Sequence, residues 1–306
     1  MLDDANTLLI LAVILVAGTI SGAIAKRFNL PSVTGQILAG VLMGESVLKL
    51  LTAERLHSLD ALVKFALGLM AVAVGSHLNF KRLRPARRRL FWLLLLEATL
   101  TPALVYCGVI AFSQTTWYTA ILLAAIAIST APATVLALVK ETGSKGSFVM
   151  TLLAGVALNN LVCIVFFEIA RTIARTAIDP NGVFISSDLI APLMKIGASL
   201  LLGFSIGIAL ILFTRQVVRS DRLSAMSLIA ILLTAGLSAQ LDLSVLLACL
   251  CLGVTLANLS PDREEIGHRV FETFESAIFA VFFTVAGMEL KFNTLALGGL
   301  LAAITF

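Results

Sequence analysis

The sequence predicts an all-α, polytopic membrane protein whose two halves repeat each other in opposite orientations. Three observations lead to this fold class. The chain of 306 residues is 59% hydrophobic and only 13% charged, whereas a soluble domain carries roughly 25% charged residues. Apolar stretches recur along its whole length, and three pairs of motifs align between its two halves. This composition excludes an ordinary soluble globular protein.

Apolar segments of about 18 to 25 residues follow one another along the chain, and each can cross a hydrocarbon core of roughly 30 Å as a helix. The first follows the acidic Asp3 and Asp4 rather than a basic stretch, so we expect a membrane helix and not a cleaved signal peptide. Since the last segment begins only at 294, we expect the sequence to be a fragment that ends inside a helix. The expected segments are 5–25, 30–48, 59–79, 90–113, 117–140, 147–171, 189–214, 223–240, 243–260, 270–290 and 294 onward.

Positive charge is divided unevenly between alternate loops. Lys and Arg number 15 in one set of loops and 6 in the other. By the positive-inside rule, the richer set, which includes 81–89, lies in the cytoplasm, and the N-terminus lies outside. The net charge of +4 therefore reflects membrane orientation and does not indicate a nucleic-acid partner.

Three motif pairs align in the same order between the two halves of the chain. Paired segments lie seven helices apart; because seven is odd, the two copies cross the membrane in opposite directions, as in an inverted-topology repeat. The pairs are Ile10–Gly18 with Leu228–Gly236, Gly40-Val41 with Gly253-Val254, and Gly75–Leu83 with Gly287–Leu295. We expect one transmembrane domain over 1–306, with repeat one at about 5–175, a linker helix at about 189–214 and repeat two from about 223, incomplete at 306.

A proline stands inside the apolar segment 117–140. Pro132 removes a backbone donor and clashes with the preceding turn, so the helix should break there. At mid-membrane depth, a break persists only where protein or a polar cavity covers the freed backbone groups, although a tolerated kink in a structural helix is the alternative. The break would offer carbonyls to a hard cation, together with the hydroxyls of Ser129, Thr130 and Thr134.

Three stretches resemble the monovalent cation:proton antiporters of the Kef and NapA types. Asn29–Gly44 looks like the second-helix signature of that family. Ser129–Thr134, followed by Val139–Glu141, resembles its first crossover helix, and Phe282–Leu290 is similar to its tenth helix. The resemblance covers nearly all of the chain.

This resemblance implies a NapA/NhaA-like antiporter fold with a dimerisation domain and a mobile core domain. It implies a multi-pass homodimer of the cell inner membrane that exchanges sodium or potassium for protons by alternating access. The expected partners are the cation, the proton and the lipid bilayer. The sequence contains no arrangement typical of an enzyme active site, and we expect neither an enzyme nor a cofactor.

One position departs from the family pattern. The helix after the crossover carries a carboxylate in the family, but here it reads Asn159-Asn160. An amide oxygen can coordinate a cation, but an amide does not titrate near neutral pH. A proton-coupled mechanism would therefore need its acid elsewhere.

Two membrane-embedded acids are candidates for that role, and an acid beyond the sequence is a third possibility. Glu97 lies about two turns inside segment 90–113, which the family places beside the crossover. Its alternative is a structural partner for a hydroxyl or a basic residue. Glu168 lies three residues before Arg171, within reach of an ion pair that would explain it equally well.

Other polar residues have more ordinary interpretations. Lys195 is expected to snorkel towards the membrane surface, His77 to end a helix, and Asp242 to form a turn or cap a helix. Thr34 and Gln36 are expected to pack helices. We predict cation/proton exchange with a relocated acid; the alternatives are a proton-uncoupled, channel-like cation pathway and a regulatory membrane protein.

Overall fold

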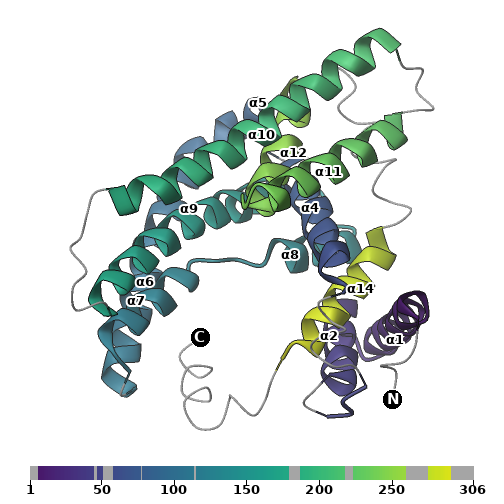
Figure 1. Ribbon diagram of the computed structural model, residues 1–306, viewed down its shortest axis with the longest axis horizontal. Coiled ribbons are helices and arrows are strands. Elements are labelled where there is room, and N and C mark those ends of the chain that lie inside the picture. Colours follow the sequence, from purple (N-terminus) through teal and green to yellow (C-terminus); the bar gives the residue numbers. More distant parts are fainter. Residues whose placement is uncertain are drawn as a thin grey trace.

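The computed structural model describes residues 6–44, 47–50, 58–76, 78–113, 115–178, 187–217, 223–259 and 275–290. Every regular element in these ranges is a helix (Figure 1). The helices are α1 (Thr7–Arg27), α2 (Ser32–Met43), α4 (Asp60–Ser76), α5 (Phe80–Leu83), the 3-10 turn η1 (Arg84–Ala86), α6 (Arg87–Phe112), α7 (Trp117–Ile126), α8 (Pro132–Glu141), α9 (Ser147–Ile178), α10 (Ser187–Val217), α11 (Leu223–Gln240), α12 (Val245–Leu259) and α14 (Glu275–Met288).

The helices pack into two groups. The scaffold group contains α1, α2, α4, α10, α11, α12 and α14, and its members are in extensive mutual contact. The crossover group contains α6, α7, α8 and α9, and it meets the scaffold group chiefly through α4 and α10 (Figure 1). An apolar core joins the two groups, with Leu136 of α8 and Leu153 of α9 buried among residues of α4.

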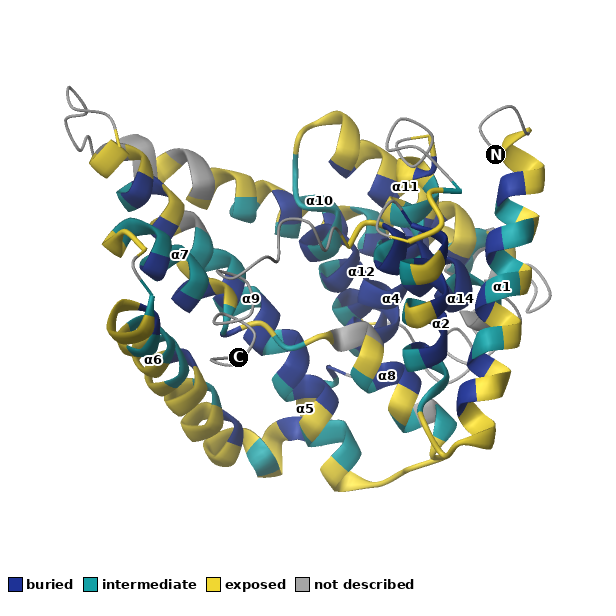
Figure 2. Ribbon diagram, turned by 90° about the horizontal axis from the view of Figure 1, so that it is seen from below, coloured by how far each residue is buried: buried dark blue, intermediate teal, exposed yellow. Residues whose placement is uncertain are grey.

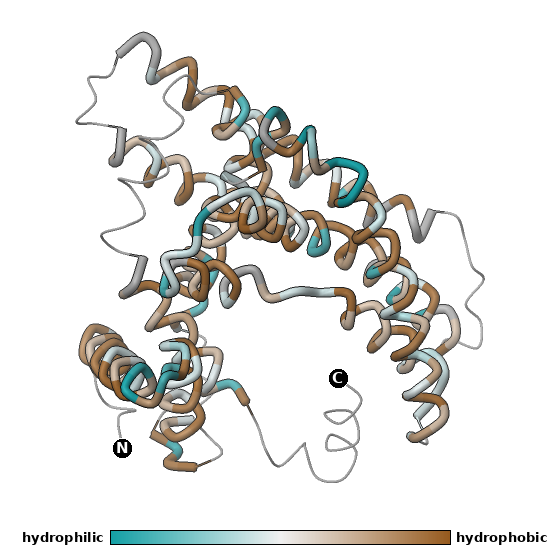
Figure 3. The backbone as a smooth tube through the Cα atoms, turned by 180° about the vertical axis from the view of Figure 1, so that it is seen from behind, coloured by the Kyte–Doolittle hydropathy of each residue, from teal (hydrophilic) through white to brown (hydrophobic). Residues whose placement is uncertain are grey.

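Several helices are long and apolar enough to cross a membrane. Within the described ranges these spans are Thr7–Arg27, Arg84–Phe112, Ser147–Arg175 and Leu193–Thr214, and shorter apolar helices accompany them. Only 11% of the most apolar part of Arg84–Phe112 is buried, and α6 runs largely exposed along the edge of the bundle (Figure 2). The helices are predominantly hydrophobic along their length (Figure 3). An exposed apolar helix face suits lipid rather than water, so the chain is a multi-pass membrane protein.

Most predicted segments agree with the helices to within a few residues. Segment 117–140 is divided between α7 and α8, as Pro132 predicted. Helix α9 continues to Ile178, past the expected end at 171, and α2 ends at Met43, before the expected 48. The segment expected from 294 onward lies outside the described residues.

Glycine contacts relate two helix pairs by the predicted repeat. A Cβ atom on Gly40 of α2 would lie 2.0 Å from the carbonyl oxygen of Thr284, and one on Gly287 of α14 would lie 2.3 Å from that of Ile37. Each glycine thus faces the carbonyl three residues before the other glycine. In the predicted repeat, Gly40 aligns with Gly253 and Gly287 aligns with Gly75.

The two aligned glycines, Gly253 and Gly75, make the same kind of contact with each other's helices. A Cβ atom on Gly253 of α12 would lie 2.3 Å from the carbonyl oxygen of Val72, and one on Gly75 of α4 would lie 2.3 Å from that of Leu250. Val72 and Leu250 again lie three residues before the partner glycine. Helix pair α4–α12 therefore repeats the close packing of α2–α14, which requires residues without a side chain.

We expect Gly40→Ala to destabilise the folded chain and Gly236→Ala to leave it unchanged or slightly more stable. The new methyl group at Gly40 would overlap a backbone oxygen, and overpacking of this kind costs about 1–3 kcal/mol. Gly236 lies in α11 with nothing within 4 Å of its Cβ position, so alanine there adds only helix propensity. Thermal unfolding of the detergent-solubilised variants measures the difference. Equal melting temperatures would contradict this account of the contact.

Candidate functional site

The segment between α7 and α8, called here the extended segment, begins with a turn and continues without helix to Pro132. Helix α7 ends at Ile126 and α8 begins at Pro132, and the five residues from Ala127 to Ala131 connect the two helices (Figure 1). The amide of Ala127 completes the last turn of α7 by donating to the Leu123 carbonyl at 3.0 Å. The amide of Ser129 still bonds the Ile126 carbonyl at 2.9 Å. The carbonyl ends of α7 and the amide ends of α8 both point towards this segment, so a cation is favoured beside the first and an anion beside the second.

Asn160 of α9 holds the extended segment in place. Its amide nitrogen donates to the carbonyl of Thr130 at 2.7 Å and to the carbonyl of Val156 at 2.9 Å. Its amide oxygen accepts from the hydroxyl of Ser129 at 3.0 Å. Both donors and one acceptor position are occupied, and the side chain is only 7% exposed. Asn160 therefore stabilises the break by satisfying backbone that α7 and α8 cannot.

Asn159 also donates two hydrogen bonds from its amide nitrogen, but within the described ranges its amide oxygen accepts none. Its nitrogen donates to the carbonyl of Ile128 at 3.0 Å and to the hydroxyl of Thr130 at 3.1 Å. Because the Ile128 carbonyl only accepts, the nitrogen must face it and the amide oxygen must face away. That oxygen is fully buried and has no hydrogen-bond partner in the described part of the chain. A buried acceptor without a donor is costly unless it receives a cation, a water molecule or a proton.

Glu97 of α6 is connected to this amide through one hydroxyl. Thr130 accepts from Asn159 and donates to a carboxylate oxygen of Glu97 at 3.5 Å, the long end of the hydrogen-bonding range. The structure thus brings together residues from α6, from α9 and from the segment between α7 and α8: Glu97, Ser129, Thr130, Asn159 and Asn160. Glu97 is exposed on the crossover group, so the carboxylate stays accessible to a proton or a cation.

The remaining predicted residues lie apart from this cluster. Thr134 is exposed on the first turn of α8. Thr34 lies partly buried in α2, where Gln36 is buried with an amide oxygen that has no partner in the described part of the chain. Asp242 occupies the turn between α11 and α12 with a φ of 53°, as a turn residue, and forms an ion pair with Lys195. His77 and the side chain of Glu168 lie outside the described residues.

Lys195 differs from the expectation in having a partner. Its ammonium group bonds the carboxylate of Asp242, and this hydrogen bond and charge lower the pKa of Asp242. A snorkelling lysine needs only the polar membrane surface, but here a turn 47 residues away supplies an acceptor. Sequence reasoning missed the pair because nothing in either local sequence indicates the other residue.

An interrupted helix lined with polar groups inside a multi-pass bundle is typical of the class of secondary transporters. The transmembrane sodium/hydrogen exchanger family model matches residues 11–306. The chain belongs to the sodium/hydrogen exchanger family. A comparison with curated protein sequences finds no match.

A solved structure has the same fold. The sodium proton antiporter MjNhaP1 from Methanocaldococcus jannaschii, determined at pH 8, superposes with a TM-score of 0.73 at 18% sequence identity. The match covers 98% of this chain and 75% of that one. The predicted antiporter fold and family are thereby confirmed.

Sequence reasoning treated the two asparagines as equal, whereas the structure separates them. Asn160 has its polar atoms bonded to the break, whereas the oxygen of Asn159 has no hydrogen-bond partner among the residues that the structure describes. The distinction depends on which carbonyls the extended segment turns towards α9. No feature of the sequence Asn159-Asn160 carries that information.

Proposed function

We propose that this chain exchanges a monovalent cation for protons, with the amide oxygen of Asn159 as a cation ligand and Glu97 as the titrating acid. The observation that carries this proposal is the buried Asn159 oxygen, which has no hydrogen-bond partner among the described residues. The nitrogen of the same amide is linked through the Thr130 hydroxyl to the Glu97 carboxylate. Amide and hydroxyl oxygens are suitable ligands for a hard cation. A cation bound nearby favours the ionised form of Glu97, so Glu97 can release its proton when the cation arrives.

The proposal extends to how the chain works in the membrane. The crossover group moves against the scaffold group, so that the site opens to each side in turn, and the chain acts as a homodimer in the inner membrane with its N-terminus outside. What supports the moving group is its limited and largely apolar contact with the scaffold. What supports the orientation is the excess of Lys and Arg in alternate loops. The transported ion is sodium or potassium.

A second candidate is a proton-uncoupled cation pathway. It is favoured by the neutral amides at Asn159 and Asn160, where the family carries a carboxylate. In that case Glu97 would serve only as an acceptor for Thr130. The two candidates differ in whether cation flux moves protons.

A liposome assay separates these candidates. The full-length protein is reconstituted with an internal pH dye under an imposed pH gradient, and sodium and then potassium are added while cation uptake is followed in parallel. We expect the native protein to collapse the gradient. Cation uptake without collapse, together with collapse in Asn160→Asp, would instead establish an uncoupled pathway on an intact fold. Absence of both signals in the native protein would overturn both candidates.

A further inference from the structure

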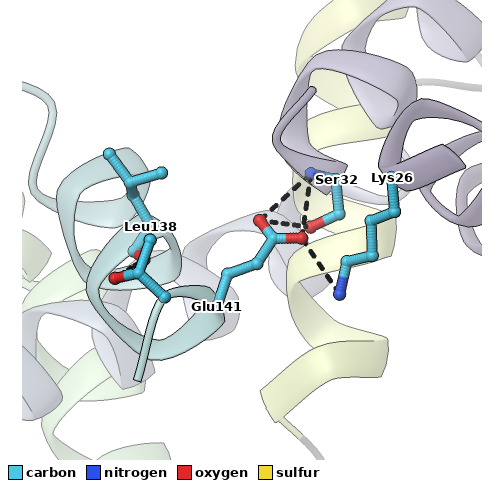
Figure 4. Close-up of polar contacts among 5 residues, drawn as sticks. Lys26, Ser32, Leu138 and Glu141 are labelled. Carbon is cyan, nitrogen blue, oxygen red and sulfur yellow. Dashed lines mark hydrogen bonds and ion pairs between the residues drawn. The ribbon is translucent and has the colours of Figure 1, made fainter. Parts of the chain in front are cut away.

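A carboxylate at the end of the crossover helix joins the two groups of helices. Glu141, the last residue of α8, reaches the hairpin between α1 and α2 (Figure 4). Its two oxygens accept from the backbone amide of Ser32 at 3.3 and 3.2 Å, and one accepts from the Ser32 hydroxyl at 3.4 Å. The ammonium group of Lys26 lies 3.0 Å from the carboxylate. One side chain thus contacts the end of α1 and the start of α2.

The position of this contact is electrostatically favourable. Ser32 begins α2, and the free amides of a helix N-terminus attract a negative charge. Lys26 supplies a full positive charge from the last turn of α1. The Glu141 side chain is only 19% exposed, compared with 57% for Lys26, so solvent screens the carboxylate only in part. A charged carboxylate therefore fits here better than a neutral side chain would.

Glu141 joins the two groups of helices at a place where they make few other contacts. Helix α8 packs against α4 and α9, not extensively against α1 or α2. The interface with α4 is apolar, and apolar surfaces can shift against each other because their attraction has no direction. Hydrogen bonds require defined distances and angles. The bonds of Glu141 consequently select one position of α8 relative to the α1–α2 hairpin.

We propose that Glu141, Lys26 and Ser32 form a latch that holds the crossover group against the scaffold group at one end of the bundle. When the latch is formed, this end is closed, and separation of the two groups at this end requires it to open. The loops that carry Lys26 and Glu141 belong to the same positively charged set, which the sequence assigns to the cytoplasm. The role of the latch in transport rests on the proposed function, but the latch itself does not.

The latch is not a sensor of pH near neutrality. Burial alone would raise the pKa of Glu141, but the hydrogen bond and charge of Lys26 and the hydrogen bonds of Ser32 outweigh it, and the pKa falls below its ordinary value of 4.5. The pKa of Glu141 is therefore lower when the latch is formed than when the two groups are apart, so protonation of Glu141 favours opening of the latch. The carboxylate stays charged above about pH 4.5, and the latch weakens only as the pH falls through the lowered pKa.

Hydrogen–deuterium exchange of the full chain in lipid nanodiscs tests the latch without any transport. In Glu141→Gln we expect the peptides over 28–36 and 136–146 to exchange faster together, by roughly 5- to 150-fold, which is the usual size of a conformational coupling. Lys26→Gln should act in the same direction and keeps the test valid if the first variant folds poorly. Lys64→Gln is the matched control, because Lys64 is 50% exposed in a pair within α4.

The outcomes are distinct. Exchange that stays at the level of Lys64→Gln, or that rises only over 28–36, would overturn the latch and leave Glu141 as a cap of α2. In liposomes, loss of the latch should shift the apparent KM for the cation in opposite directions on the two faces, because it changes the fraction of each state. A native protein without exchange activity would refute the proposed function while leaving the deuterium result to decide on the latch.

Discussion

Replacing Asn160 by leucine is expected to lower the free energy of unfolding by about 2–4 kcal/mol and to abolish cation transport. The leucine is close in size, but it removes two hydrogen bonds to carbonyls and one from the Ser129 hydroxyl. The Thr130 carbonyl would lose the amide that satisfies it in the interior of the bundle. The extended segment could then no longer keep its shape, and the Asn159 oxygen would lose its setting.

Asn258 offers a matched control for this experiment. Its nitrogen donates to the carbonyls of Leu78 at 2.7 Å and Val254 at 2.8 Å, and its oxygen accepts from the Phe80 amide at 2.9 Å. Asn258→Leu thus removes the same kinds of hydrogen bond at the end of α12, away from the break. Denaturant unfolding should show a comparable loss of stability in both variants, and cation uptake measures their transport separately. Transport by correctly folded Asn258→Leu should survive, and a result in which both variants lose it equally would contradict a specific role for Asn160.

Glu97→Gln is expected to remove proton coupling completely while leaving the fold intact. The glutamine oxygen can still accept from Thr130, so the hydrogen-bonded chain to Asn159 is kept and only the titrating group is lost. Dye-reported proton movement should fall to that of empty liposomes. Since Glu97 is exposed, we expect little change in melting temperature.

Asp60→Asn is the control for Glu97→Gln, because it neutralises a carboxylate at the start of α4, outside the site. Proton coupling should persist in this variant. If Glu97→Gln still collapsed the pH gradient on addition of sodium or potassium, the acid of this transporter would have to be sought in another residue. Cation uptake that continued without proton movement would identify Glu97 as the coupling group alone.

The fold could be predicted from the sequence to a large extent, because membrane segments and their breaks depend on local chemistry. Pro132 predicted the interruption, and the alignment of Gly40 with Gly253 predicted the repeat. Pro132 accounts for the reach of the interruption back to Ile128, because its ring clashes with that carbonyl and it has no amide to donate to it. The path of the backbone across the interruption could not be predicted. That path depends on the side-chain amides of α9, which bond the carbonyls of Ile128 and Thr130.

The residues of the candidate site could be predicted, but their arrangement could not. Thr130 and Glu97 were expected near each other only because the family places their segments together. Which asparagine oxygen lacks a partner among the described residues depends on the path of the backbone across α9. The latch joins Glu141 to Ser32, which lies 109 positions earlier in the chain. Contacts over such separations leave no periodic signal in the sequence. They arise from the packing of whole helices.

The reciprocal glycine contacts have a mechanical consequence. Where backbone rests on backbone, no side chain can change rotamer to absorb a displacement. Helices α2 and α14 therefore move together as one rigid pair, and so do α4 and α12. A displacement at one end of such a helix pair therefore also moves its other end. Deformation must then concentrate where compliant side chains separate the helices, along the apolar surface between α4 and the pair α8–α9.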